Sequence, residues 1–148
     1  MKLVINIPCL NEEHTLPLVL KELPRAIEGI DEIEVQVVDD GSTDATAAVA
    51  AAHGCRVIRH KQNLGLGMAF RHGVEAALRC GADIMVNTDA DNQYPSSYIP
   101  GLVRPILEHR ADVVIGDRQT SRGVHFSPFK RLMQWLGSSI VRRLTGTE

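Results

Sequence analysis

Two aspartates with the spacing of oxygen ligands follow an apolar run in the second half of the chain. Asp89 and Asp91 are two residues apart, and Gln93 continues the same spacing. In extended backbone, residues two apart project to the same side, so the three side chains form one set of oxygen ligands. Such ligands suit Mg²⁺ or Mn²⁺, which keeps coordination positions for substrate phosphates. The alternative, that both aspartates only solvate a turn before Tyr94 and Pro95, is disfavoured by their position after a buried strand.

A second acidic pair, Asp39 and Asp40, ends another apolar run. Adjacent carboxylates resist each other's charge unless a cation or a hydrogen-bond donor lies near them. We therefore expect a ligand with N–H or hydroxyl donors, such as a nucleobase or a ribose. The Gly-Ser-Thr-Asp sequence at 41–44 also predicts a turn and a cap for the following helix. Asn11 is open to the same two interpretations, helix cap or ligand contact, with Glu12 favoured in the first turn of a helix.

Other common site chemistries are not indicated. Gly65 and Gly67 form half of a dinucleotide fingerprint, but they follow the third apolar run and no GxGxxG sequence is present. The six histidines have no metal-ligand spacing. The three cysteines form no CxxC pair, so neither a zinc site nor a disulfide framework is predicted. A reducing, cytoplasmic location fits this cysteine usage best.

The elements that position these clusters alternate along the chain. Short runs rich in Val and Ile predict five buried strands, at Leu3–Ile7, Ile33–Val38, Cys55–Ile58, Ala82–Val86 and Asp112–Ile115. Between them, helical spacing predicts helices from Asn11 to about Ile30, Asp44 to about His53, Gly67 to Cys80 and Ser96 to His109. This order predicts an α/β fold with a mainly parallel sheet and helices on both faces. The ligand crevice of such a sheet lies beyond the carboxyl ends of its strands, where the polar clusters follow.

Composition and charge divide the chain into two parts. Its 148 residues, 44% hydrophobic and 23% charged, suit one globular domain. The net charge of -2 conceals an acidic body at 1–117 and a basic segment at 118–148, which has six Lys or Arg and one acidic residue. The basic segment favours anions, but the acidic body argues against nucleic-acid binding. An amphipathic helix is predicted at 128–144, for lying on a lipid surface or for packing on protein.

Four motifs, in this order, carry a resemblance. They are Pro8-x-x-Asn11-Glu12-Glu13, Val37-Val38-Asp39-Asp40-Gly41-Ser42-Thr43-Asp44, Asn63-x-Gly65-x-Gly67-x-Ala69 and Asp89-Ala90-Asp91-Asn92-Gln93-Tyr94-Pro95, with Gly116-Asp117-Arg118 after the last predicted strand. The chain resembles the family 2 glycosyltransferases, and within them the branch of the dolichol-phosphate mannosyltransferases. The resemblance implies a GT-A fold and an inverting transfer of a sugar from a nucleotide-diphospho-sugar, with UDP or GDP as the nucleotide.

The resemblance also implies roles for particular residues. It places Pro8, Leu10, Glu12, Val38 and Asp40 at the nucleoside with Asp39 close by, Ala90 at the substrate, Arg118 near the phosphates, and Asp89, Asp91 and Gln93 around Mg²⁺ or Mn²⁺ at the diphosphate. Leu10 departs from the aromatic residue frequent at this position in the family. Family members usually continue further, so we expect a chain that is C-terminally truncated, with 1–117 as the nucleotide-sugar-binding core and 118–148 as the start of the acceptor side.

The expected reaction is a displacement at the anomeric carbon by an acceptor oxygen. A hydroxyl acceptor needs a general base and a lipid phosphate does not, because its oxygen is already anionic. Asp117 is either that base or the ion-pair partner of Arg118. The basic segment favours a polyprenyl-phosphate acceptor and peripheral contact with the cytoplasmic face of a membrane through 128–144. The alternatives are a non-catalytic nucleotide-sugar and metal-binding module and, less favoured, a phosphate-accepting receiver domain.

Overall fold

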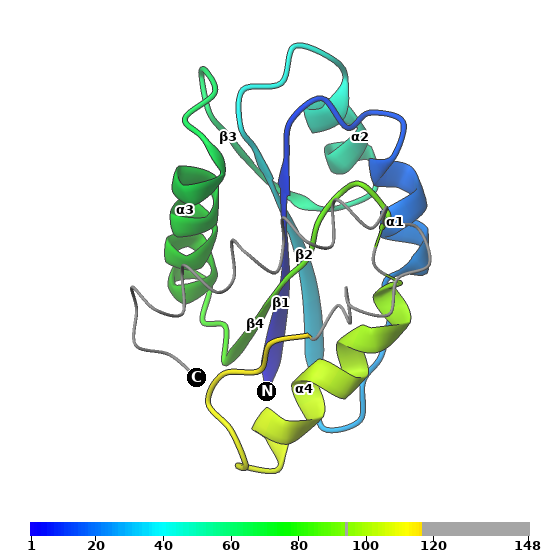
Figure 1. The fold of residues 1–148 in the computed structure, drawn as a ribbon, viewed down its shortest axis with the longest axis vertical. Helices are drawn as coiled ribbons and strands as arrows, with labels where there is room; N and C mark the ends of the chain where they lie inside the picture. The colour runs from blue at the N-terminus through cyan, green and yellow to red at the C-terminus, as the bar shows by residue number, and fades with distance from the viewer. Residues whose placement is uncertain (94, 117–148) are drawn as a thin grey trace, which may run out of the picture. The chain divides into compact units, whose positions relative to one another are not determined.

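A parallel four-stranded sheet forms the centre of the molecule. The structure is a computed structural model that describes residues 1–93 and 95–116. The strands are β1 (Lys2–Cys9), β2 (Glu32–Asp39), β3 (Arg56–Arg59) and β4 (Ile84–Asn87), and they lie in the order β3-β2-β1-β4 (Figure 1). Every neighbouring pair is parallel. All the strands therefore end at the same edge of the sheet.

Helices cover both faces of this sheet, as predicted. They are α1 (Leu16–Glu22), α2 (Thr46–Ala52), α3 (Leu66–Arg79), the 3-10 turn η1 (Ser96–Tyr98) and α4 (Ile99–Leu107). Figure 1 shows α3 on one face and α1, α2 and α4 on the other. None of the helices in the described ranges is long and apolar enough to span a membrane. The described elements lie in the unit Met1–Val114, and the division of the chain after residue 117 stays a prediction.

The main core lies on the face of α1, α2 and α4. Alternate residues of β1 point to this face, and they pack with apolar side chains of all three helices; the buried cluster includes Leu3, Ile5, Ile7, Cys9, Leu16, Val19, Leu23, Val37, Ala50, Ile99 and Val103. Because β1 pairs on both edges and is covered on both faces, its apolar run is nearly continuous. Burial of these side chains is the largest favourable contribution to the fold.

The opposite face carries a row of amides under α3, in which Gln36 and Asn6 are fully buried and Asn87 is exposed. Gln36, Asn6 and Asn87 lie directly opposite one another on β2, β1 and β4. The Gln36 side chain donates to Asn6 Oδ1 at 2.8 Å, and Asn6 Nδ2 donates to Asn87 Oδ1 at 2.7 Å. Gln36 Nε2 also donates to the Gly73 carbonyl of α3 at 2.7 Å. A Cβ at Gly73 would meet Asn6 Oδ1 at 2.5 Å, so only glycine lets the helix approach this closely.

Two predicted elements are wrong in part or in whole. The first helix covers Leu16–Glu22 instead of about 11–30, because Leu23 precedes Pro24 and takes an extended conformation with ψ 140°. The predicted strand Asp112–Ile115 is not a strand. A strand needs a hydrogen-bonding neighbour, and none of the described strands pairs with this run, whose Val113 and Ile115 are 76% and 87% exposed. The helix predicted at 128–144 lies outside the described residues.

Replacement of Gly73 tests the close approach of α3. Gly73→Ala should lower the free energy of unfolding by about 1–3 kcal/mol, since the added methyl group must push the Asn6 amide out of its hydrogen bonds. Urea denaturation measures the change. Gly67→Ala in the same helix is the matched control, because no atom lies within 4 Å of its Cβ position. The control should be neutral or stabilise by up to about 1 kcal/mol; equal effects of the two variants would contradict the packing described.

Candidate active site

The polar clusters predicted from the sequence meet where the parallel strands end. Residues 10–13 follow β1, 40–44 follow β2, 60–65 follow β3 and 88–93 follow β4. In Figure 1 the loops after β1 and β2 lie together at the upper end of the sheet. Shared strand direction, set by the crossovers through the helices, thus brings together four segments that are far apart in the sequence.

The loops after β1 and β2 are joined by reciprocal hydrogen bonds. Backbone N–H groups of one loop donate to side chains of the other in both directions; the bonds are Asn11 N to Ser42 Oγ (2.9 Å), Glu12 N to Thr46 Oγ1 (2.8 Å), Thr43 N to Asn11 Oδ1 (2.9 Å) and Ala45 N to Glu13 Oε2 (2.8 Å). Asn11 sits in the left-handed region, with φ 57°. Its side chain accepts the Thr43 N–H of the other loop and does not cap α1, so the interpretation of Asn11 as a helix cap is wrong. Asp44 accepts the N–H of Thr46, the first residue of α2.

The side chains of the two adjacent aspartates lie on opposite faces of the sheet. The Asp39 side chain is fully buried, accepts the Ser42 N–H at 2.9 Å, and has its Oδ2 3.1 Å from Arg59 Nε. That contact is an ion pair without hydrogen-bond geometry, so Asp39 Oδ2 is a buried atom with no hydrogen bond. Asp40 contacts a different set of groups, described next. The cation and donors that this acidic pair was expected to need come from the chain itself, and the two side chains point apart because they are adjacent in extended backbone.

Asp40 organises the loop between β3 and α3. Its carboxylate is 5% exposed and accepts three bonds, from His60 Nδ1 at 2.6 Å and from the backbone N–H groups of Leu64 and Gly65 at 2.9 Å each. Burial by itself would raise the pKa of Asp40, but the bonds from His60 and the two amides outweigh it, and the pKa lies below its usual value. Asp40 is therefore ionised at neutral pH and fixes the backbone just before α3.

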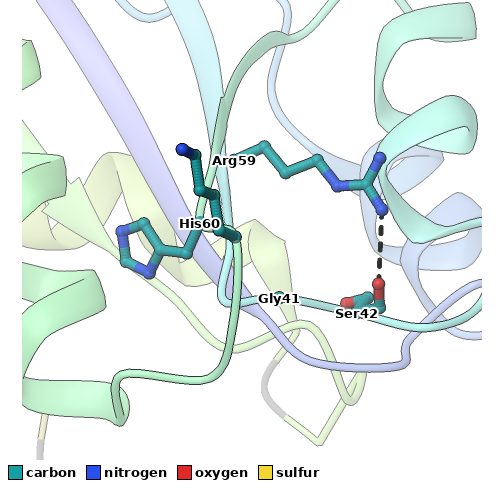
Figure 2. Close-up of a pocket in the computed structure, with 5 residues that line it drawn as sticks. Gly41, Ser42, Arg59 and His60 are labelled. Carbon is teal, nitrogen blue, oxygen red and sulfur yellow. Dashed lines mark hydrogen bonds between the residues drawn. The ribbon is translucent and has the colours of Figure 1, made fainter.

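A small pocket opens beside the ends of β2 and β3. It encloses about 320 Å³ and is lined by Gly41, Ser42, Arg59, His60 and Lys61 (Figure 2). Figure 2 shows the Arg59 side chain reaching to the Ser42 carbonyl, 3.3 Å away, while the His60 ring turns to the other side. Gly41 has φ 79°, and a Cβ there would lie 2.4 Å from the backbone of Gln62, so the two loops touch through a glycine. The pocket adds two basic side chains to an otherwise acidic edge.

The predicted metal ligands lie on the loop after β4. Asp89 is half-buried, Ala90 is buried, and Asp91 and Gln93 are exposed. Asp91 Oδ1 accepts the Gln93 N–H at 3.0 Å, so this aspartate also shapes the turn. Within 1–93 and 95–116, no three acidic, histidine or cysteine side chains gather as a metal cluster. Two carboxylates and an amide nevertheless fit a hard cation that takes its remaining ligands from a nucleotide and water.

The other predicted contact residues line the same edge. Pro8 and Val38 face each other across β1 and β2; Pro8 is half-buried, and Val38 is fully buried. Leu10 is 40% exposed just past β1, and Glu12 is half-buried in the joined loops. Arg118 and Asp117 lie outside the described residues. Sequence reasoning assigned no role to Arg59, His60 and His72, whose spacing matches no ligand motif; the one signal was that Arg59 and His60 come where β3 ends.

Acid should weaken the fold through Asp40. A carboxylate whose pKa is lowered by folding contributes stability above its unfolded pKa of about 3.9, and that contribution is lost as pH falls through the folded value. Asp40→Asn should cost about 2 kcal/mol at pH 7, since the amide cannot accept all three bonds, and should flatten the acid side of the stability profile. Urea denaturation between about pH 3 and pH 7 measures both. Asp112→Asn, at an exposed aspartate, is the control; a parallel loss in both variants would contradict the assignment.

Comparison with known proteins agrees with the fold. The chain is 34% identical to glucosyl-3-phosphoglycerate synthase from Mycobacterium tuberculosis, solved with Mn²⁺, UDP and glucosyl-3-phosphoglycerate; the TM-score is 0.59 over 72% of this chain and 39% of that one. A structure of the same synthase with Mg²⁺ and UDP matches with a TM-score of 0.58, the same identity and the same shares of both chains. The predicted α/β class with a GT-A fold is thereby confirmed.

Proteins related in sequence include two mannosyltransferases. An undecaprenyl-phosphate mannosyltransferase from Micrococcus luteus is 32% identical over 99% of this chain and 61% of its own length. A dolichol-phosphate mannosyltransferase from Pyrococcus furiosus is 32% identical over 97% of this chain and 41% of its own length. An uncharacterised protein from Methanocaldococcus jannaschii is 36% identical over 82% of this chain and 48% of its own length. The chain thus spans about half the length of the curated relatives it matches, and with residues 4–145 matching the model of glycosyl transferase family 2, it belongs to that family.

Proposed function

We propose that the chain is the donor-binding part of an inverting glycosyltransferase that takes a hexose from a nucleotide-diphospho-sugar. One observation carries the proposal: the loops after β1, β2 and β4 meet at the carboxyl edge of a parallel sheet, in a chain 34% identical to a synthase solved with UDP-glucose and Mn²⁺. In that position a ligand meets oxygen acceptors from several strands at once.

The nucleoside would lie against the joined loops after β1 and β2. The residues proposed to contact it are Pro8, Leu10, Glu12, Val38, Asp39 and Asp40. An ionised carboxylate offers about four lone-pair sites, and His60, Leu64 and Gly65 fill three of those of Asp40. The remaining site would accept an N–H of the base. Because Val38 is fully buried, its contribution would come from the backbone.

The diphosphate would lie at the loop after β4. Asp89, Asp91 and Gln93 would hold Mg²⁺ or Mn²⁺ there, with Ala90 beside the substrate and Arg118 near the phosphates. A bound ion supplies positive charge to the leaving diphosphate. The chain's own part is to orient the donor, so that an acceptor oxygen attacks the anomeric carbon from the face opposite the leaving group.

The acceptor we propose is a polyprenyl phosphate. The support is twofold: relatives whose names specify undecaprenyl-phosphate and dolichol-phosphate mannosyl transfer align along nearly the whole chain, and residues 118–148 carry six Lys or Arg with one acidic residue. Basic, amphipathic sequence such as 128–144 suits a peripheral contact with an anionic membrane surface. A phosphate acceptor would need no general base, so Asp117 could serve as the partner of Arg118.

Loss of one carboxylate tests the metal assignment. Asp91→Ala should abolish Mn²⁺-dependent binding of UDP and GDP, lowering affinity at least roughly tenfold by removal of a charged ligand. The fold should persist, because Asp91 is exposed on the loop after β4. Calorimetry with and without EDTA measures the effect, with thermal unfolding as the check on folding. Glu22→Ala, at an exposed carboxylate of α1, is the control; unchanged Mn²⁺-dependent affinity in Asp91→Ala would overturn the metal site.

Transfer itself is tested with labelled donors. A thermal-shift screen of UDP- and GDP-sugars with Mn²⁺ should identify the donor, and that donor with a short-chain polyprenyl phosphate should give a glycolipid whose anomeric configuration, read by NMR, is inverted. Retention would contradict the inverting mechanism. Nucleotide binding with neither transfer nor slow donor hydrolysis would favour the alternative, a binding module that acts only with further sequence or a partner chain.

A further inference from the structure

A chain of three hydrogen-bonding side chains links β2, β3 and α3 below the proposed donor site. Asp40 follows β2, His60 follows β3, and His72 lies in the second turn of α3. His60 Nδ1 lies 2.6 Å from Asp40 Oδ1, and His60 Nε2 lies 2.8 Å from His72 Nδ1. The two imidazole rings meet edge to face, with centroids 4.9 Å apart. His60 is 8% exposed and His72 half-buried.

The geometry limits how many protons the two rings can hold. Asp40 is ionised, so His60 Nδ1 carries a proton and donates it to the carboxylate. The 2.8 Å contact between His60 Nε2 and His72 Nδ1 needs one proton between the two nitrogens. The pair is therefore compatible with a charge of zero or +1. With both rings cationic, two N–H groups would point at each other, and the contact would break.

In the part of the chain that the structure describes, His72 forms no ion pair of its own. On α3, Arg71 and Glu75 pair with each other at 2.9 Å. Lys61 follows His60 and is exposed, and Arg59 lies against Asp39 on the other side of the strand. Asp40 is the anion in contact with the pair, through His60. When the pair already carries a charge of +1, a further proton is therefore repelled by that charge.

We propose that His60 and His72 are positioning residues of the donor site. While one proton lies between their rings, the hydrogen bond that it forms holds α3 to the end of β3, and we call this contact the lock. Protonation of both rings breaks the lock. The segment 61–65 runs from His60 to the start of α3, and the amides of Leu64 and Gly65 bind Asp40. Release of His72 therefore loosens the loop that fixes the carboxylate proposed to bind the base. This inference rests on the proposed function for its effect on the donor, while the lock itself is a property of the ligand-free chain.

The lock is tested first without nucleotide. Imidazole ¹⁵N NMR spectra of the full chain, recorded between about pH 8 and about pH 5, should show the signals of His60 and His72 changing together. The Gly65 amide signal should shift with them. In His72→Asn, the side-chain amide takes the place of Nδ1 and can donate to His60 without titrating, so the Gly65 signal should stay near its neutral-pH position. A Gly65 signal that stays in place while the His72 signal moves would overturn the proposal.

The effect on the donor is tested by calorimetry with UDP and GDP in the presence of Mn²⁺. Wild-type affinity should fall between about pH 7.5 and pH 5.5, by up to roughly tenfold, the effect expected for the loss of about one hydrogen bond. Because the terminal phosphate of the nucleotide titrates near pH 6 as well, the comparison of variants carries the test. His72→Asn should keep the neutral-pH affinity and lose most of the pH dependence, whereas His72→Leu should bind weakly at both values.

His109→Asn, at an exposed histidine after α4 with φ 52°, should behave as wild type. A full wild-type pH dependence in His72→Asn would overturn the positioning role. If the wild-type chain binds neither UDP nor GDP at any pH, the proposed function fails, and the Gly65 signal alone then decides whether the lock exists.

Discussion

Parallel pairing of β1 with β2 and β4 is the constraint on which the site depends. Each parallel pair requires a crossover long enough to return the chain to the starting edge, and here every crossover contains a helix. Because each loop after a strand leads into a helix, it does not have to connect the ends of two adjacent strands. Polar residues that would be costly in the core can therefore collect at the carboxyl edge, where backbone N–H groups are available to them.

The acidic edge is stabilised by the chain's own donors. Asp39 and Asp40 are nearly inaccessible to water, yet between them they receive one ion pair and four hydrogen bonds from the chain. Burying a carboxylate without such partners would cost several kcal/mol. The negative charges of the two carboxylates are thus compensated before any ligand binds, and the loops that provide the donors are held in one arrangement.

Sequence reasoning located the strands more reliably than the contacts at their ends. The apolar runs of β1 to β4 were visible because burial on two faces demands continuous apolar residues. The run 112–115 has the same composition, but strand formation also needs a partner edge, which composition does not encode. The partners of Asp39 and Asp40 could not be read either, since three of their donors are backbone amides, which no residue type indicates. His60 and His72 are 12 positions apart with no motif spacing, and only the packing of α3 on the sheet, against β1 and β2, brings them together.

The row of amides under α3 also determines which strand pairings are available. Gln36, Asn6 and Asn87 can bond to one another only while they are directly opposite. A slip of β1 by one residue would turn Asn6 into the apolar core and place Ile5 or Ile7 under α3. Asn6 or Gln36 buried without a partner would cost about 1–3 kcal/mol. The row of amides thus makes a sheet misaligned by one residue costly, and it keeps the strand ends, with the residues that follow them, at matching heights.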